Sequence, residues 1–270
     1  MRYLMMASAS GYGVPLVFIP GILCYSFSWR NNLGPLSRFA PVYAIDPLNA
    51  GYSEHVPDLP ADLGSTADRL AQFLDAAGID AAHLVGSSHG GGVAMTMAAR
   101  LPQRVKSLVL VAPVNPWSRL SDKLIAFYQT WLGALFATIV PWIPRNLQQR
   151  EFGAVYGDCA RMSRETIEGY AQSWRVPGTT RHILRILHGW QSDLELLERC
   201  IPELKMPVLV IGGDCDPVVS PRSLQVLAKE IPQAELKVIR GAGHLCQEEC
   251  PEAFNAIVEE HLKEFQEERV

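Results

Sequence analysis

The chain has 270 residues, of which 48% are hydrophobic and 19% are charged, and its formal net charge at pH 7 is -4. This composition predicts a globular protein with one large core and excludes a mostly disordered chain. The negative charge, with no cluster of lysine and arginine to offset it, excludes a nucleic-acid-binding surface, so we expect no nucleic-acid partner.

The chain begins with an apolar stretch at residues 1–7 that is too short for a signal peptide, so we expect a cytoplasmic protein. Short runs rich in Val, Ile and Leu then alternate with segments of helical spacing. Such continuous runs suit strands that are buried on both faces of a parallel sheet. The pattern predicts an α/β fold with a doubly wound, mostly parallel sheet flanked by helices. The predicted strands are 14–19, 41–45, 82–85, 107–111, 207–211 and 235–239, and the predicted helices include 65–77, 221–229 and 252–265.

The third predicted strand leads into the pentapeptide Gly-Ser-Ser-His-Gly at residues 86–90, and small residues of helical character follow it. Glycines on both sides of a serine allow a sharp turn from strand to helix, and that turn leaves the serine hydroxyl exposed. Ser88 is therefore a candidate nucleophile. Because the pentapeptide is common by chance, its flanking elements and its partners elsewhere in the chain carry the prediction.

The alternation of strands and helices stops between residues 115 and 203. This break predicts a helical cap inserted into a core made of residues 1–114 and 204–270. Five of the six tryptophans lie in the cap. A single tryptophan at helical spacing is more often part of a subdomain core. The concentration of aromatic residues in the cap as a whole, however, predicts an apolar substrate pocket. The candidates for its wall are Trp117, Phe127, Trp131 and Trp142.

Residues 124–144 of the cap carry no charge over a length that could span a bilayer. A crossing here would leave the two halves of the sheet on opposite sides of the membrane. We therefore expect no transmembrane span, and instead a buried cap helix or a lid helix that faces lipid or forms a homodimer through the cap.

A nucleophilic serine needs a general base, because its hydroxyl is hardly ionised at neutral pH. His244 follows the last predicted strand in a Gly-Ala-Gly-His loop, at the sheet edge that also carries Ser88. The base needs a carboxylate to orient it. Asp214 and Asp216 both follow the strand at 207–211, and chain order does not choose between them. Structural or solvated roles are expected for the other histidines outside the pentapeptide, which are His55, His83, His182, His188 and His261.

A metal site would need a different set of ligands. His244, Cys246 and Cys250 lie close together in sequence, but no second cysteine pair accompanies them. The six cysteines also show no framework spacing, so we expect reduced thiols and no metal.

These motifs resemble the α/β-hydrolase fold superfamily, in particular its capped, cofactor-free branch of serine esterases. Gly213 to Pro217 is similar to the family motif Gly-x-x-Asp-Pro, which implies that Asp216 is the acid and that Asp214 occupies a variable polar position. Residues 46–53 resemble the family's loop after a core strand. Residues 241–244, with Glu249 and Pro251 downstream, resemble its histidine loop. The resemblance covers nearly the whole core and implies no cofactor.

The same resemblance implies two backbone donors for the oxyanion, the N–H groups of Ile22 and His89. Family members carry a His-Gly pair before the first of these positions, whereas this chain has Pro20 before Gly21. The backbone donor is kept, but the bracing histidine side chain is missing.

The function implied is that of a carboxylesterase, which acts on a small-molecule ester and water through an acyl-enzyme on Ser88. A serine at the elbow counts against haloalkane dehalogenases and epoxide hydrolases, which use an aspartate there. Carbon–carbon bond hydrolases, thioesterases, lactonases, perhydrolases and hydroxynitrile lyases share the triad and stay open as alternatives. A non-catalytic ligand receptor on the same fold is the alternative of another class.

Overall fold

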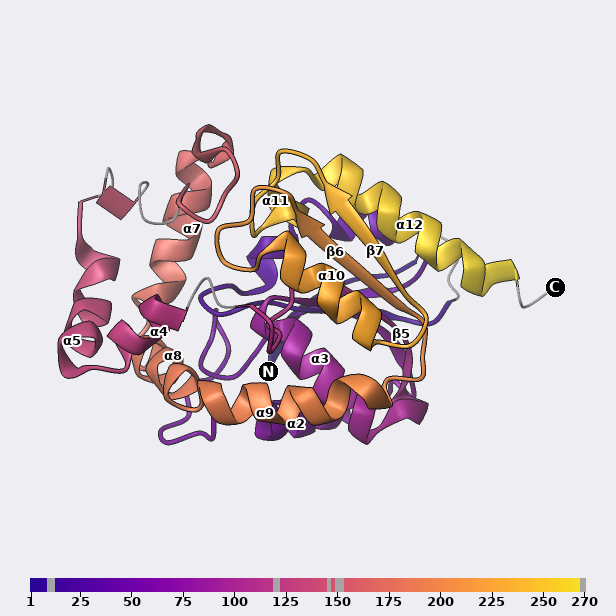
Figure 1. Ribbon diagram of the computed structural model, residues 1–270, viewed down its shortest axis with the longest axis horizontal. Helices are drawn as coiled ribbons and strands as arrows, with labels where there is room; N and C mark the ends of the chain where they lie inside the picture. The colour runs from indigo at the N-terminus through magenta and orange to yellow at the C-terminus, as the bar shows by residue number, and fades with distance from the viewer. Residues whose placement is uncertain (9–12, 119–121, 145–146, 149–152, 268–270) are drawn as a thin grey trace.

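A seven-stranded sheet forms the centre of the molecule (Figure 1), in the order β1-β3-β2-β4-β5-β6-β7. The computed structural model describes residues 1–8, 13–118, 122–144, 147–148 and 153–267. Strands β2 to β7 pair in parallel, and β1 pairs with β3 antiparallel. The predicted doubly wound, mostly parallel sheet is confirmed. The strands are β1 (Arg2–Met6), β2 (Leu16–Ile19), β3 (Val42–Asp46), β4 (Ala82–Ser87), β5 (Val105–Val111), β6 (Val208–Gly213) and β7 (Ala234–Ile239).

The two edge strands differ from the sequence-based expectation. β1 was not predicted, although it lies in the apolar stretch at residues 1–7; all five of its residues are exposed at the edge of the sheet. Only Ile239 of β7 is buried, because this strand forms the opposite edge of the sheet. By contrast, every residue of β2, β4 and β6 is buried, as parallel strands covered on both faces require.

Helices cover both faces of the sheet (Figure 1). On one face, α2 (Leu63–Ala76), α3 (His89–Arg100), α9 (Trp190–Cys200) and α10 (Pro221–Glu230) bury leucines and valines in one apolar cluster. On the other face, α1 (Leu33–Leu36), α11 (Cys246–Glu249) and α12 (Pro251–Glu267) contribute to a second cluster around Trp29 and Phe254. This three-layer arrangement leaves the carboxyl ends of the strands free to carry loops.

The other helices of the segment that was predicted as a cap gather at one end of the molecule (Figure 1). They are α4 (Asp122–Tyr128), α5 (Trp131–Ile139), α7 (Arg164–Trp174) and α8 (Thr179–His188). The described part of residues 115–203 contains no strand. One difference concerns α9, which the sequence placed in the cap. Leu194 and Leu197 of α9 lie in the core cluster, because this helix packs on the sheet layer beside α3.

Within the described residues, no single helix is long and apolar enough to cross a membrane. The helices at Asp122–Tyr128 and Trp131–Trp142 reach the length and apolar content of a membrane span only when they are taken together. They are bent by 90° at the break between them.

A buried carboxylate joins α9 to the start of α2. Asp193 accepts a hydrogen bond from the Leu63 backbone N–H at 3.0 Å, while its second carboxylate oxygen is buried without a partner among the described residues. Burial, with a smaller contribution from the nearby Asp62 charge, raises the pKa of Asp193 from 3.8 to about 6. The folded state therefore holds this proton more tightly than the unfolded chain does.

We expect Asp193→Asn to stabilise the protein at pH 8 but not at pH 4. A raised acid pKa means that stability falls as pH rises from about 4 to about 6, and the full penalty is present above that window. The asparagine keeps the acceptor for Leu63 and removes the charge. The melting temperature, followed by circular dichroism, should rise by about 2–4 °C at pH 8. An equal rise at both pH values would contradict the proposed cause.

Candidate active site

Ser88 lies at the turn between β4 and α3, where the sequence predicted it. Its backbone has φ 52° and ψ -119°, a conformation that a residue other than glycine seldom adopts. The surrounding backbone fixes this geometry, because the Ser88 N–H donates to the Val111 carbonyl at 2.9 Å and the Ser88 carbonyl accepts from the Val114 N–H at 3.0 Å. Strain that the surroundings maintain in this way is typical of functional positions.

The glycines of the pentapeptide are needed for close backbone contacts. A Cβ atom on Gly90 would lie 2.4 Å from the Ile19 carbonyl oxygen and 2.5 Å from that of Pro20. On Gly86 it would lie 2.5 Å from the Gly90 carbonyl oxygen. The start of α3 therefore packs directly against the loop after β2, which brings that loop next to Ser88.

His244 and Asp216 form a buried pair at the same edge of the sheet. The His244 Nδ1 lies 2.9 Å from Asp216 Oδ2, and the other oxygen of this carboxylate accepts from the Val218 and Val219 N–H groups at 2.7 and 2.9 Å. Because a carboxylate accepts, His244 Nδ1 donates, and this leaves Nε2 with a free lone pair. That is the tautomer a general base needs.

Asp214, the competing carboxylate, lies elsewhere. It is exposed, and its Oδ1 accepts from the Gly241 N–H at 2.6 Å. This bond fixes the start of the loop that carries His244. The structure therefore places Asp216 against the histidine and Asp214 at the base of its loop.

No hydrogen bond joins Ser88 Oγ to His244, although the structure describes both residues. Such contacts are often long in the absence of a substrate and tighten in the reactive complex. Ser88 and His244 are carried by loops at the carboxyl ends of β4 and β7, within one sheet.

The N–H groups of Ile22 and His89 are both available as donors. His89 is the first residue of α3, where an N–H has no partner inside the helix. Neither N–H group donates to an acceptor among the described residues. A Cβ atom on Gly21, the residue before Ile22, would lie 2.9 Å from the Ser88 Cβ. The chain therefore reaches Ser88 closely without the histidine that resembling proteins carry in place of Pro20.

Glu249 ties the histidine loop to the segment of chain around residue 157. Its side chain is fully buried, and Oε2 accepts from the Gly243 N–H at 2.7 Å, directly before His244. The same carboxylate accepts from the N–H groups of Gly157 and Asp158 at 3.0 and 2.9 Å. One side chain thus holds the backbone next to the base and part of the predicted cap segment.

The neighbouring Glu248 makes a second connection of this kind. Its buried carboxylate accepts from Arg30 Nη1 at 2.6 Å and from the hydroxyls of Tyr170, on α7, and Tyr156. Burial raises the pKa of Glu248, while the Arg30 guanidinium opposes that shift. Sequence reasoning did not identify this cluster, because Glu248 lies 218 residues from Arg30, 92 from Tyr156 and 78 from Tyr170 in the chain.

The predicted aromatic wall of the pocket needs correction. Trp131 and Trp142 are 74% and 68% exposed, and Phe127 is 42% exposed. They lie on the outer side of α4, α5 and the turn that follows, so they do not enclose a substrate. Trp117 packs partly buried against the core. The exposed apolar face is compatible with the predicted homodimer through the cap, which stays a prediction.

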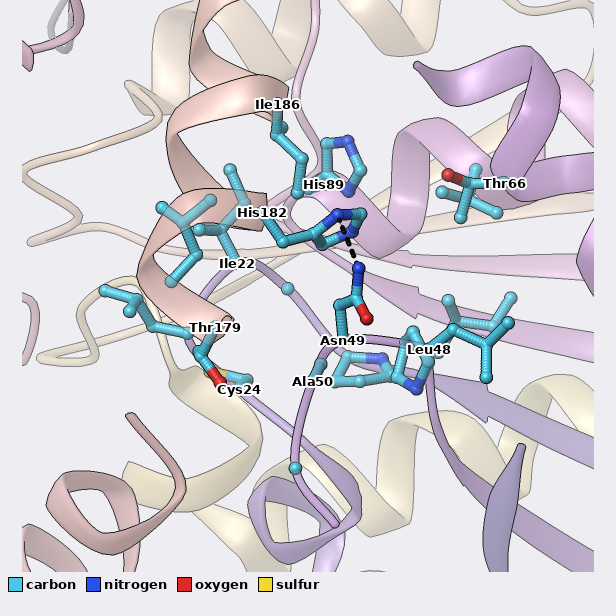
Figure 2. Close-up of a pocket in the computed structure, with 18 of the residues that line it drawn as sticks. Ile22, Cys24, Leu48, Asn49, Ala50, Thr66, His89, Thr179, His182 and Ile186 are labelled. Atoms are coloured by element: carbon cyan, nitrogen blue, oxygen red, sulfur yellow. Dashed lines mark hydrogen bonds between the residues drawn. The ribbon is translucent and has the colours of Figure 1, made fainter. Parts of the chain in front are cut away.

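A different pocket lies beside Ile22 and His89, the two candidate oxyanion donors (Figure 2). His182 of α8 is buried in its wall, although the sequence suggested a structural or solvated role. The available signal was the spacing of Thr179, His182 and Ile186, which places all three on one side of a helix. Their inward direction could not be inferred without knowing where α8 packs.

Within the described residues, no group of three or more His, Cys, Asp or Glu side chains is arranged to hold a metal ion. All six cysteines are free thiols. Burial raises the pKa of the Cys24 thiol, at the end of the loop after β2, to about 12.

Comparison with known proteins agrees with this fold. A family model described as alpha/beta hydrolase fold matches residues 14–251. The chain is 29% identical over 264 residues to the 2-hydroxymuconate semialdehyde hydrolase of a Pseudomonas species, covering 94% of this chain and 89% of that protein. It is 30% identical over 260 residues to the dihydrolipoyllysine-residue acetyltransferase component of the acetoin cleaving system of Cupriavidus necator. That match covers 95% of this chain, but the chain spans only 65% of the relative's length.

Among solved structures, the chain is similar to a serine-to-alanine variant of the meta-cleavage product hydrolase of Pseudomonas fluorescens, complexed with acetates. The TM-score is 0.80, and the match covers 98% of this chain and 94% of the other at 22% identity. At this identity the likeness concerns the fold.

Proposed function

Because the chain belongs to the α/β-hydrolase fold family, we propose that it is a serine hydrolase that cleaves carboxylic esters of small to medium apolar or aromatic compounds. The main support is the buried His244–Asp216 pair, which leaves a free Nε2 on the same sheet edge as the strained Ser88 turn. Ester cleavage needs such a base, a nucleophile and two N–H donors, and His244, Ser88 and the N–H groups of Ile22 and His89 are the candidates for these roles.

In the proposed mechanism, Ser88 Oγ attacks the ester carbonyl carbon while His244 Nε2 takes the hydroxyl proton. The negative charge that forms on the carbonyl oxygen is held by the N–H groups of Ile22 and His89. When the carbon–oxygen bond of the ester breaks, His244 returns the proton to the departing alcohol, and the acyl group remains on Ser88. Asp216 keeps the Nδ1 proton in place and stabilises the imidazolium.

Water completes the cycle. His244 Nε2 takes a proton from the water molecule that attacks the acyl-enzyme, and the two N–H groups hold the second oxyanion. The bond to Ser88 Oγ then breaks, and His244 returns the proton to this oxygen. The products are a carboxylic acid, an alcohol and the free enzyme, so no cofactor is required.

A second candidate is the hydrolysis of a ring-cleavage product at a carbon–carbon bond. It is favoured by the names of two similar proteins, the 2-hydroxymuconate semialdehyde hydrolase and the meta-cleavage product hydrolase. The same Ser88, His244 and Asp216 would serve that reaction, so the catalytic groups do not discriminate between the two substrates.

Parallel assays of the two kinds of substrate separate these functions. We expect saturable hydrolysis of p-nitrophenyl butyrate and p-nitrophenyl benzoate, with kcat/KM on the order of 10⁴ M⁻¹s⁻¹ or more. The absorbance of 2-hydroxymuconate semialdehyde should decay more slowly under the same conditions. Fast decay of the semialdehyde without ester turnover would favour carbon–carbon cleavage. Tight binding of either compound without turnover would favour a receptor.

A further inference from the structure

The pocket beside the proposed oxyanion donors is built from six parts of the chain (Figure 2). These are the end of β2 with its following loop, the loop after β3, the start of α3, the inward side of α8, and one residue each from α2 (Thr66) and α7 (Ser173). Two of its lining residues, Ile22 and His89, are also the proposed oxyanion donors. A substrate whose carbonyl oxygen binds these N–H groups therefore places its neighbouring atoms at the mouth of this pocket.

The acyl part of an ester is the part that this pocket can take. The departing alcohol must lie next to His244, because that residue returns its proton. None of the described residues that line the pocket belongs to the loop of His244. With the alcohol on the His244 side, the acyl chain is left to extend past Ile22 and His89.

The wall of this pocket is apolar with a few uncharged polar groups. None of the described lining residues is Asp, Glu, Lys or Arg. Arg69 and Arg185 act on His182 from outside the lining, so a carboxylate in the acyl chain would lose its hydration here without a cationic side chain in direct contact, which is unfavourable. The polar side chains that could bind a substrate atom are those of His89, His182, Asn49, Thr66, Ser173 and Thr179.

The hydrogen bonds of Asn49 determine which ring nitrogen of His182 carries its proton. Asn49 Oδ1 accepts from the Val56 N–H at 2.6 Å, and Nδ2 donates to the Val56 carbonyl at 3.0 Å, so the orientation of the amide is fixed. Nδ2 also lies 3.3 Å from His182 Nδ1. Because an amide nitrogen only donates, His182 Nδ1 accepts. Burial and the nearby Arg69 and Arg185 charges lower the pKa of His182 to about 4, so its proton at neutral pH is on Nε2.

His89 adds a second imidazole next to the first. Figure 2 shows the two rings side by side, with the Asn49 amide beyond His182. His89 is 7% exposed, and its Nε2 is buried without a hydrogen-bond partner among the described residues. Burial lowers the pKa of His89 to about 4, with a smaller contribution from His182. A buried polar atom without a partner is unfavourable, so a ligand that supplies one would gain affinity.

We propose that this pocket selects uncharged acyl groups that carry a hydrogen-bond acceptor, such as a ketone or ether oxygen, and that the His182 Nε2–H donates to it. The proposal rests on the proposed ester hydrolysis and specifies its substrate class. His89 is the second polar contact in the same pocket. Carboxylate-bearing acyl chains are excluded by the uncharged wall.

Three esters with the same leaving group and similar acyl length test this specificity. They are p-nitrophenyl pentanoate, p-nitrophenyl 4-oxopentanoate and the mono-p-nitrophenyl ester of glutaric acid, each corrected for its rate of hydrolysis in the same buffer without enzyme. We expect kcat/KM for the oxo ester to exceed that for pentanoate by about 2–12-fold, the range for one neutral hydrogen bond. The glutarate ester should be at least about tenfold slower than pentanoate. A preference for the glutarate ester, or no preference for the oxo ester, would overturn the proposal.

Variants on α8 assign the effect to His182. In His182→Leu the ratio of oxo ester to pentanoate should fall to about one, and His182→Gln, which keeps an N–H donor, should restore part of it. His188→Leu is the matched control, because His188 is exposed on the same helix and does not line this pocket. Its ratio should equal that of the wild type. An unchanged ratio in His182→Leu would contradict the assignment. Because each ratio compares two substrates on one protein sample, partial misfolding does not alter it.

Binding measurements keep this test separate from the proposed catalysis. Isothermal titration calorimetry on Ser88→Ala should show tighter binding of methyl 4-oxopentanoate than of methyl pentanoate, and the difference should disappear in Ser88→Ala/His182→Leu. If the wild type hydrolyses no ester but this difference is present, the proposed function fails and the pocket assignment stands. If esters are hydrolysed and no difference is found, the pocket assignment fails alone.

Discussion

Ser88→Ala is expected to lower kcat for p-nitrophenyl butyrate by about 10⁴–10⁶-fold, leaving only the rate that binding and the oxyanion donors provide. The change removes the single atom that attacks the carbonyl carbon. It keeps the Cβ atom, so the backbone at φ 52° is no more strained in the variant than in the wild type. Initial rates by stopped-flow absorbance, with circular dichroism to verify folding, measure the effect.

Ser87→Ala is the matched control for this experiment. Ser87 precedes the proposed nucleophile, and its hydroxyl is buried without a partner among the described residues. Removing this hydroxyl should leave kcat/KM within about threefold of the wild type. If Ser87→Ala were inactive and Ser88→Ala active, the nucleophile would be misassigned.

Asp216→Asn should have the next largest effect, a loss of about 10⁴-fold in kcat. The asparagine amide nitrogen could donate where the carboxylate accepts. His244 would then be held in the wrong tautomer, with its proton on Nε2. The amide oxygen would remain the acceptor for the N–H groups of Val218 and Val219, which is why the nitrogen is the group that faces His244. The loss should appear in kcat more than in KM, because Asp216 acts on the base and does not line the proposed acyl pocket.

Asp214→Asn is the control for Asp216→Asn. It tests whether activity depends on the carboxylate that contacts His244 or on any carboxylate after β6. Asp214 is exposed, and an asparagine keeps the oxygen that accepts from the Gly241 N–H. Its kcat/KM should stay within about threefold of the wild type. A large loss in this variant, with a small one in Asp216→Asn, would reverse the assignment of the acid.

Much of the fold could be predicted because buried parallel strands have a direct sequence signature. The runs that became β2, β4 and β6 are apolar on both faces, and all of their residues are buried. β1 was missed because its apolar residues were considered only as a possible signal peptide, and they lie exposed at the edge of the sheet. α9 was assigned to the cap because helical spacing shows that a helix has a buried side but does not show which element covers it.

The candidate site was predictable to the extent that its groups follow strands. Ser88 and His244 lie in loops at strand ends, and the topology of a parallel sheet brings such loops to one edge. The choice between Asp214 and Asp216 depends on a turn whose geometry chain order does not specify. Only family resemblance favoured Asp216 beforehand, and the structure places that carboxylate 2.9 Å from His244.

The pocket was the least predictable part, because its lining comes from six separated segments. Aromatic content in the cap suggested a wall of Trp131 and Trp142, but both side chains lie at the surface. The number of aromatic residues in a segment does not show whether their side chains point into a pocket or toward the surface. His182 and Asn49 are placed together by the packing of α8 on the loop after β3. That packing joins residues 133 positions apart in the chain.

Covalent labelling tests most directly whether Ser88 is an activated nucleophile. The wild-type protein would be treated with a serine-directed phosphonate, digested, and analysed by mass spectrometry, with Ser88→Ala treated in parallel. We expect one phosphonate adduct per chain, located on Ser88, and no adduct in the variant. An adduct on another residue, or no labelling of a folded wild-type protein, would contradict the proposed mechanism.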